Sequence, residues 1–386
     1  MPFSYWEKNT FIKSPDVAII GSGIVGLFSA FFLKQSKPNL HILILERGML
    51  PYGASTRNAG FACFGSPSEL LSDLCHQSES DVFSLVEKRW RGLLLMRNIL
   101  GDQSISYEPF GGHEIFTPAD QLIFEKCADK LSFLNSQLQE IAGIKNIYTI
   151  SNSKIKENGF ENVENLILNS GEGQIDTGAM MKTLLEKCKA IGIEVLNGAN
   201  VTEIIENDKH VDIQLSDDSI SPSSAEIIRT QKLLICTNGF SKKFLPDQDI
   251  EAARAQVLIT EPIKDLKVKG SFHYDSGYYY FRNVGNRILI GGGRNLDFQN
   301  ENTVEFGLTD TVQSHLENLL HTMILPDTPF KIDMRWSGIM GLGKQKSPLI
   351  QQIKQNIFCA VRMGGMGVAI GSQTGKEASN LIIQNL

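Results

Sequence analysis

The sequence lacks paired cysteines and runs of basic residues, and each absence excludes a class of protein. Its six cysteines are far apart and none forms a C-x-x-C pair, so neither a zinc site nor a disulfide framework is indicated. A net charge of -6 without a lysine or arginine run argues against a nucleic-acid-binding surface. We therefore expect no metal and no nucleic-acid partner, and a reducing cytoplasm is the simplest compartment.

The sequence also shows no secretory signal and no internal repeat. The apolar run from Val17 to Leu33 is close to bilayer length. However, it contains three glycines within six residues, and each costs roughly 1 kcal/mol in a helix interior. We therefore expect no membrane span. With 386 residues, 42% of them hydrophobic, the chain is long enough for two domains with a large core.

The stretch DVAIIGSGIVGLFSAFFLKQ, from Asp16 to Gln35, has the spacing G-x-G-x-x-G between an apolar run and a helical pattern. We predict a strand over residues 16–20 and a helix that ends before Pro38. The glycines then fall where a dinucleotide-binding fold needs a tight turn, close backbone approach to a pyrophosphate, and close helix–strand packing. The residues predicted to contact the cofactor at this turn are Gly21, Gly23, Ile24 and Gly26.

A second buried strand is predicted in HILILERG, residues 41–48, which completes a β-α-β unit. Its Glu46 lies 20 residues beyond Gly26, where a carboxylate accepts hydrogen bonds from a ribose diol. A carboxylate there disfavours a 2'-phosphate and therefore NADP. The fingerprint by itself leaves FAD and NAD open.

The segment PYGASTRNAGFACFG, residues 51–65, follows directly and on composition alone is an ordinary surface loop. Its order of residues, E-R-x(5)-G-A-S-x-R-N-x-G, resembles the FAD-wrapping segment of the D-amino-acid oxidase, glycine oxidase and sarcosine oxidase superfamily. This resemblance implies FAD as the cofactor. The residues that it places against FAD are Arg47, Ser55, Thr56, Asn58, Ala59 and Gly60.

Further segments match that superfamily in order. The resemblance places Val201 near the adenine end and Thr237 and Gly239, from KLLICTNGFS, near FAD. The tail IFCAVRMGGMGVAIG reads as a strand, a glycine turn and a terminal helix, and amides at a helix N-terminus stabilise an anion. In a flavoenzyme that anion is reduced flavin at its N1/O2 edge, whereas the alternative is a packing turn. The residues concerned are Gly364, Gly365, Met366 and Gly367.

Within the superfamily the chain is most similar to the γ-glutamylputrescine oxidase-like branch, through SYWEKN, ARAQVLITEPI, YFRNVGNRILIGGG and RWSGIMGLGKQKSPLI. The resemblance implies an α/β fold with a discontinuous, Rossmann-like FAD-binding domain over residues 1–80, 170–248 and 336–386. A substrate domain (α+β) with an antiparallel sheet is expected over residues 81–169 and 249–335. The active site is expected at the interface between the two domains.

Gly291–Gly293 has no G-x-G-x-x-G continuation into an apolar helix, so no second dinucleotide site is predicted. A two-dinucleotide reductase is therefore excluded, and electrons come from an organic substrate. The favoured function is oxidation of a C–N bond of an amine by hydride transfer to flavin N5, with O2 or another acceptor reoxidising the flavin. The alternatives are oxidation of a small amino acid, an NAD dehydrogenase with one Rossmann domain, and a flavin-binding protein without turnover.

The candidate substrate-pocket residues are Tyr280, Arg282, Met340 and His113, and each is equally explained as core or surface. Amino-acid oxidases of the superfamily bind the substrate carboxylate with an arginine whose place here is occupied by Met340 or a neighbouring glycine. We therefore expect an amine without an α-carboxylate, of which a γ-glutamyl polyamine-like compound is the family's example. If Arg282 or Arg335 binds the carboxylate as a replacement clamp, a small amino acid remains an alternative substrate.

Sarcosine-oxidase relatives attach FAD through a cysteine in the segment that corresponds to residues 338–348, and this segment contains none. The resemblance therefore implies FAD that is not covalently bound. Cys63, beside the flavin-wrapping segment, is the one serious candidate for a different attachment.

Overall fold

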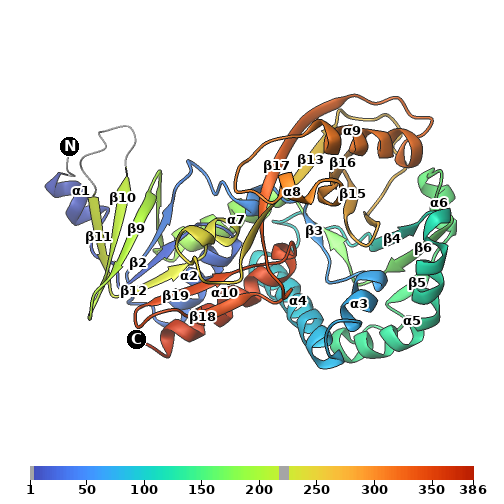
Figure 1. The fold of residues 1–386 in the computed structure, drawn as a ribbon. Helices are drawn as coiled ribbons and strands as arrows, with labels where there is room; N and C mark the ends of the chain where they lie inside the picture. Colours follow the sequence, from blue (N-terminus) through green and yellow to red (C-terminus); the bar gives the residue numbers. More distant parts are fainter. Residues whose placement is uncertain (1–3, 217–225) are drawn as a thin grey trace.

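The computed structural model describes residues 4–216 and 226–386. Residues 1–3 and 217–225, which belong to the predicted FAD-binding segments, lie outside the described residues. Two large sheets lie at opposite ends of the molecule, with helices α4 (Glu79–Leu100) and α10 (Gly367–Ile383) near its middle (Figure 1). The fold is mixed α/β, as predicted, with one mainly parallel and one mainly antiparallel sheet.

The first sheet has six strands in the order β18-β19-β12-β1-β2-β8. All neighbours pair in parallel except β18, which runs antiparallel to β19. Strands β1 and β2 are buried along their whole length, which is typical of a parallel sheet covered on both faces. The strands are β1 (Val17–Ile20), β2 (Ile42–Glu46), β8 (Glu194–Asn197), β12 (Lys232–Ile235), β18 (Leu349–Gln352) and β19 (Ile357–Val361).

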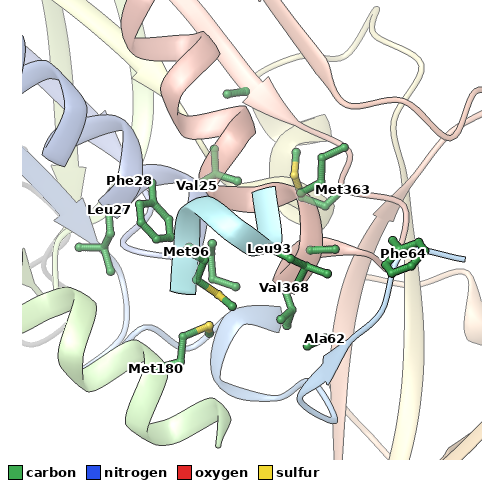
Figure 2. Close-up of a cluster of buried hydrophobic side chains, with 14 of the residues drawn as sticks. Val25, Leu27, Phe28, Ala62, Phe64, Leu93, Met96, Met180, Met363 and Val368 are labelled. Carbon is green, nitrogen blue, oxygen red and sulfur yellow. The ribbon is translucent and has the colours of Figure 1, made fainter. Parts of the chain in front are cut away.

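Alternate residues of these strands enter two different cores because successive side chains point to opposite faces. Val17 and Ile19 join the core formed with α2 (Ile24–Ser36), α4, α5 (Gln121–Ala142), α7 (Thr177–Ala190) and α10. Figure 2 shows the part of this core between α2, α4, α7 and α10. Ala18 and Ile20 instead face a three-stranded sheet of β9 (Asn200–Glu206), β10 (Val211–Ser216) and β11 (Glu226–Thr230).

The second large sheet has eight strands in the order β17-β13-β16-β15-β14-β4-β6-β5. It is antiparallel, as predicted, except between β14 and β4, which pair in parallel. The strands are β4 (Gly112–Phe116), β5 (Tyr148–Ile150), β6 (Asn165–Asn169), β13 (Glu251–Thr260), β14 (Ser271–Tyr274), β15 (Tyr279–Val284), β16 (Arg287–Gly292) and β17 (Ile332–Leu342).

The register of the eight-stranded sheet separates its two faces. Phe272, Phe281, Ile290 and Leu258 lie opposite one another on neighbouring strands and form a core with helix α9 (Asp310–Leu319). The adjacent row, one residue along each strand, faces the other way, toward the parallel sheet, and consists of His273, Tyr280, Gly291 and Val257.

The remaining elements are short helices and a small sheet. Strand β17 runs through the predicted domain boundary at residue 336, and α4 contributes to the core of the parallel-sheet half although most of it falls in the predicted substrate segment. The domain limits stay a prediction. No helix of residues 4–216 and 226–386 has the length and apolarity needed to cross a membrane. The short helices are α1 (Tyr5–Thr10), α3 (Pro67–Leu74), α6 (Ser153–Asn158) and α8 (Phe298–Glu301), and the small sheet consists of β3 (Phe61–Ala62) and β7 (Gly173–Gln174).

Candidate active site

A cavity of about 770 Å³ lies between the two large sheets. Its walls come from the carboxyl ends of β1, β2 and β12, from residues 53–61, from the inward face of the eight-stranded sheet, and from the turn before α10. In open α/β sheets, ligands bind outside the carboxyl ends of the strands. The cavity therefore combines a nucleotide-binding edge with a wall of the second sheet.

Two of the three fingerprint glycines line the cavity, and the third packs the helix against the strand. Gly21 has a φ of +102°, and a Cβ there would lie 2.9 Å from the carbonyl oxygen of Cys236. A Cβ on Gly26 would lie 2.0 Å from the carbonyl oxygen of Gly21, so this residue packs α2 against β1 and does not line the cavity. Gly21, Gly23 and Ile24 do line it, at the N-terminus of α2. This end of the cavity suits a pyrophosphate.

Glu46 lines the cavity at the end of β2 and is fixed by three hydrogen bonds. Its Oε2 accepts from the Ser22 backbone N at 3.1 Å and from the Ser22 hydroxyl at 2.8 Å. Its Oε1 accepts from the Gly48 N at 2.9 Å. A carboxylate oxygen can accept more than one hydrogen bond, so the buried group can still accept from a ribose hydroxyl.

The predicted flavin-wrapping segment borders the cavity through Ser55, Asn58, Ala59 and Gly60, and Arg47 borders it nearby. The Asn58 side chain shapes the loop, because its Oδ1 accepts from the Gly60 N at 2.8 Å and the Thr177 hydroxyl at 3.0 Å. Thr56 does not line the cavity. Its side chain turns away and donates to the Pro51 carbonyl at 2.6 Å.

The more distant predicted FAD contacts converge on the same cavity. Its lining includes Val201, Thr237, Gly364, Gly365, Met366 and Gly367. Gly364 and Gly365 have φ values of +60° and +80°, a conformation that glycine adopts at no steric cost, and they precede α10. Gly239 does not line the cavity because it packs against β17, where a Cβ would lie 2.5 Å from the Met340 carbonyl oxygen.

Of the four substrate-pocket candidates, Tyr280 and Met340 line the cavity and Arg282 and His113 do not. The Tyr280 ring packs edge-to-face on Phe61, with 5.6 Å between the ring centroids, and burial raises the pKa of its hydroxyl to about 12. The Met340 sulfur lies 3.5 Å from where a Cβ of Gly365 would be. Met340 thus lies beside the turn before α10, whereas Tyr280 lines the cavity from β15, three strands away in the same sheet.

The other candidates are held elsewhere. Arg282 shares the sheet face of Tyr280, but its Nη2 donates to the Ile175 carbonyl at 2.9 Å, and burial lowers its pKa to about 10. His113 is buried against the Phe272 ring, and burial lowers its pKa to about 4. Arg335 pairs with Glu317 at 2.9 Å and is not part of the lining. Neither arginine proposed as a replacement clamp therefore reaches the cavity.

Polar residues that sequence reasoning did not single out also face the cavity: Glu69 of α3, Arg89 of α4 and His273 of β14. Glu69 Oε2 accepts from the Ser66 N and hydroxyl at 3.3 and 3.2 Å. Burial raises the pKa of Glu69, but the basic groups of His273, Lys346 and Arg89 outweigh it and hold the pKa below the ordinary value. Only Glu69 left a sequence signal, as a capping box after Ser66.

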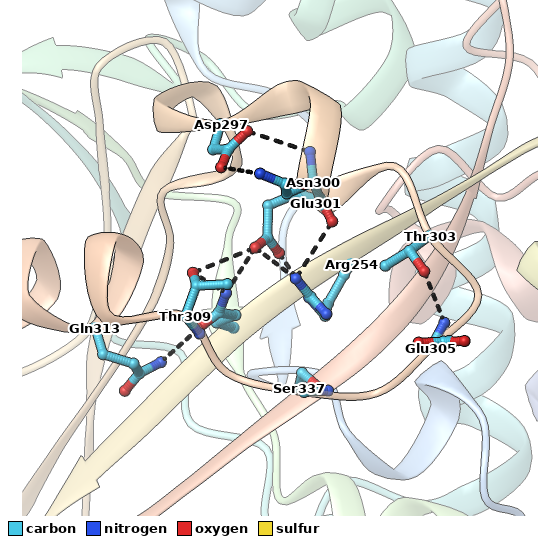
Figure 3. A network of polar contacts seen from close by, with 11 residues as sticks. Arg254, Asp297, Asn300, Glu301, Thr303, Glu305, Thr309, Gln313 and Ser337 are labelled. Carbon is cyan, nitrogen blue, oxygen red and sulfur yellow. Dashed lines mark hydrogen bonds and ion pairs between the residues drawn. The ribbon is translucent and has the colours of Figure 1, made fainter.

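The segment between α8 and α9 packs against Arg57, which lines the cavity. Its Phe306 lies against Tyr52, and the Arg57 guanidinium lies over both rings at 4.2 and 4.5 Å from their centroids. Arg57 lines the cavity and donates to the Ser337 carbonyl on β17 at 2.9 Å. A buried network around Arg254 and Glu301 anchors both ends of this segment (Figure 3).

Comparison with known proteins agrees with this fold. Residues 16–381 match the family described as FAD dependent oxidoreductase (DAO). The chain is 23% identical over 394 residues to the probable oxidoreductase OrdL of Haemophilus influenzae, with 97% of this chain and 84% of that protein covered. The predicted superfamily is confirmed.

Two solved structures with low sequence identity share the fold. Glycine oxidase from Bacillus cereus aligns with a TM-score of 0.75 at 14% identity, covering 96% of this chain and 98% of that one. L-proline dehydrogenase from P. horikoshii aligns with a TM-score of 0.74 at 15% identity, covering 96% and 94%. Because the family match extends over nearly the whole sequence, this chain belongs to the DAO family of FAD-dependent oxidoreductases.

Proposed function

We propose that this protein oxidises the C–N bond of an amine and that its FAD is bound without a covalent link. The observation that carries the proposal is that one cavity is lined by two of the dinucleotide glycines and Glu46 and also by Tyr280 and Met340 of the second sheet. When bound, FAD supplies the acceptor for the hydride that leaves the substrate carbon, while the nitrogen gives up a proton to form an imine. The family implies FAD as the cofactor.

The residues present fit an FAD molecule. The glycines at the α2 and α10 turns leave backbone open to the cavity, and Glu46 offers acceptor oxygens at the end of β2. Cys63 is buried and lines the cavity, and burial raises the pKa of its thiol well above the ordinary value, which disfavours the reactive thiolate. All six cysteines are unpaired, which supports a reducing compartment such as the cytoplasm.

The cavity wall supports a substrate without an α-carboxylate. The resemblance places Met340 or a neighbouring glycine where related amino-acid oxidases carry an arginine, and the flexible thioether of Met340 suits a methylene chain. Tyr280 and Phe61 extend this apolar surface. We therefore propose a primary or secondary alkyl amine, with O2 or another molecule as the final electron acceptor.

Alkyl amines are expected to bleach the bound flavin under anaerobic conditions faster than glycine, sarcosine or D-amino acids do. The physical reason is that position 340 offers no guanidinium that could donate hydrogen bonds to an α-carboxylate. The measurement is stopped-flow absorbance at the flavin bands. Faster bleaching by the α-amino acids than by every amine without an α-carboxylate would show that the proposed substrate class is incorrect. A flavin that no amine bleaches would indicate a flavin-binding protein without turnover.

Glu46→Ala is expected to weaken FAD binding about tenfold or more, because loss of a charge-assisted hydrogen bond costs roughly 1.5–3 kcal/mol. Non-covalent binding allows the affinity to be measured by titrating apoprotein with FAD and following flavin fluorescence. Glu194→Ala is the matched control, because Glu194 lies on the neighbouring strand β8, outside the cavity. Equal FAD affinity in the Glu46 and Glu194 variants would contradict the placement of the ribose.

A further inference from the structure

Arg89 is a buried arginine on the cavity wall with most of its hydrogen-bond donors unused. It lies in the middle of α4, and its side chain is 6% exposed. Its Nη1 donates to the Phe64 carbonyl at 3.1 Å. Its Nε is buried without a partner, and its Nη2 makes no hydrogen bond to the described residues. The open donors therefore belong to a guanidinium that lines the cavity.

No described carboxylate lies within ion-pair distance of Arg89, although Glu114 and Glu172 are buried nearby and Glu69 is half-buried near it. Glu172 Oε1 accepts from the Phe64 and Gly65 N at 2.8 and 3.2 Å, and burial raises its pKa to about 8. Glu114 accepts from Ser66 and Ser68, and burial raises its pKa to about 7. Burial thus favours the neutral form of both carboxyl groups. Glu69 keeps its charge and interacts electrostatically with Arg89, but it shares that charge with His273 and Lys346, makes its hydrogen bonds to Ser66 and forms no ion pair with Arg89 among the described residues.

Three other basic residues around the cavity and in the core have ion-pair partners. Lys346, which also lines the cavity, pairs with Asp73 at 2.7 Å. Arg254 pairs with Glu301 at 2.8 Å, and Arg362 pairs with Asp249 at 2.9 Å. Arg282 also has a buried Nε without a partner, but it does not line the cavity, whereas Arg89 does. Leaving a buried cation unpaired is costly, so Arg89 calls for an anion that arrives with a ligand.

We propose that Arg89 binds a carboxylate of the substrate, and that the substrate is an amine that carries this carboxylate away from the carbon that is oxidised. The inference rests on the proposed function and narrows its substrate class. A planar guanidinium offers parallel donors to a carboxylate. Arg89 comes from α4, whereas Met340 comes from β17, so the carboxylate is bound on a different wall from the one used by an arginine at position 340.

The carboxylate site is tested on the FAD-loaded protein with ligands that are not oxidised. Acetate, butyrate and hexanoate are titrated while the flavin absorbance spectrum is recorded, and at least one is expected to bind with a saturable change. Arg89→Met is expected to weaken that binding about tenfold or more, because the charge and both donors are lost. Arg89→Lys keeps the charge but loses the planar guanidinium, so we expect it to bind the carboxylate more weakly than the wild type and more tightly than Arg89→Met. Arg91→Met is the control, because Arg91 is exposed on α4 and pairs with Glu87.

Kinetics with matched substrates separate a carboxylate site from a general role near the flavin. In the wild type, 4-aminobutyrate is expected to reduce the flavin at lower concentration than butylamine, and Arg89→Met is expected to remove this preference by raising KM for 4-aminobutyrate alone. The inference is overturned if no carboxylate binds, if Arg89→Met and Arg91→Met bind it equally, or if Arg89→Met slows both amines by the same factor. If no amine bleaches the flavin, the proposed function fails, and the butyrate titration still decides the role of Arg89.

Discussion

Gly26→Ala is expected to abolish FAD retention and to lower the free energy of unfolding by about 3 kcal/mol or more. The added Cβ would lie 2.0 Å from the carbonyl oxygen of Gly21 and 3.4 Å from the Ile19 side chain. The nearest atom is backbone, so a side-chain rotation cannot relieve the clash, and α2 must move away from β1. That movement displaces the helix N-terminus that borders the cavity. Urea unfolding and flavin content after gel filtration measure the two effects.

Gly53→Ala is the control for this substitution. Gly53 lines the cavity, but a Cβ there meets no atom within 4 Å and its φ of -88° suits any residue. We expect its stability and flavin content to stay close to those of the wild type. If Gly26→Ala retains both as well, the close packing of α2 on β1 is not what the fingerprint glycine provides.

The β-α-β unit could be predicted from sequence because its signals are local. Glycine spacing, an apolar run and a proline predicted a strand at 16–20, a helix ending before Pro38 and a strand within 41–48. The structure has them at Val17–Ile20, Ile24–Ser36 and Ile42–Glu46. The N-cap of α7 is also determined by neighbouring residues, since the Asp176 side chain accepts a hydrogen bond from the Ala179 N at 2.8 Å.

The substrate side of the cavity could be predicted only as far as the faces of the strands. Alternation along a strand predicts that Tyr280 and Arg282 lie on one face of β15, and the two residues do lie two positions apart on this strand. The far end of a long side chain depends on tertiary partners, and the Ile175 carbonyl holds Arg282 away from the cavity. Arg89 gave no signal, because it lies in a long helix without a motif and gains its role only when α4 packs beside α10.

Glu301→Gln is expected to lower the free energy of unfolding by about 3–5 kcal/mol, the usual cost of removing one partner of a buried ion pair. The Glu301 side chain is 1% exposed and that of Arg254 is 10% exposed. Arg254 donates to both Glu301 oxygens, at 2.9 and 2.8 Å, and Gln256 donates to Oε1 at 2.8 Å. Glutamine keeps the shape but removes the charge and replaces an acceptor with a donor that faces the guanidinium (Figure 3). Thermal and urea unfolding measure the loss.

Glu305→Gln is the matched control, because Glu305 is exposed on the same segment and is expected to change stability by less than about 0.5 kcal/mol. The double variant Glu301→Gln, Arg254→Met is expected to recover part of the loss, since it no longer buries an unpaired cation. Gln256 also forms hydrogen bonds with Thr309. Loss of the network therefore frees both ends of the segment whose Phe306 packs against Arg57. Glu301→Gln is therefore expected to weaken FAD binding as well as the fold. Wild-type stability in that variant, or no recovery in the double variant, would show that the ion pair does not hold this side of the cavity.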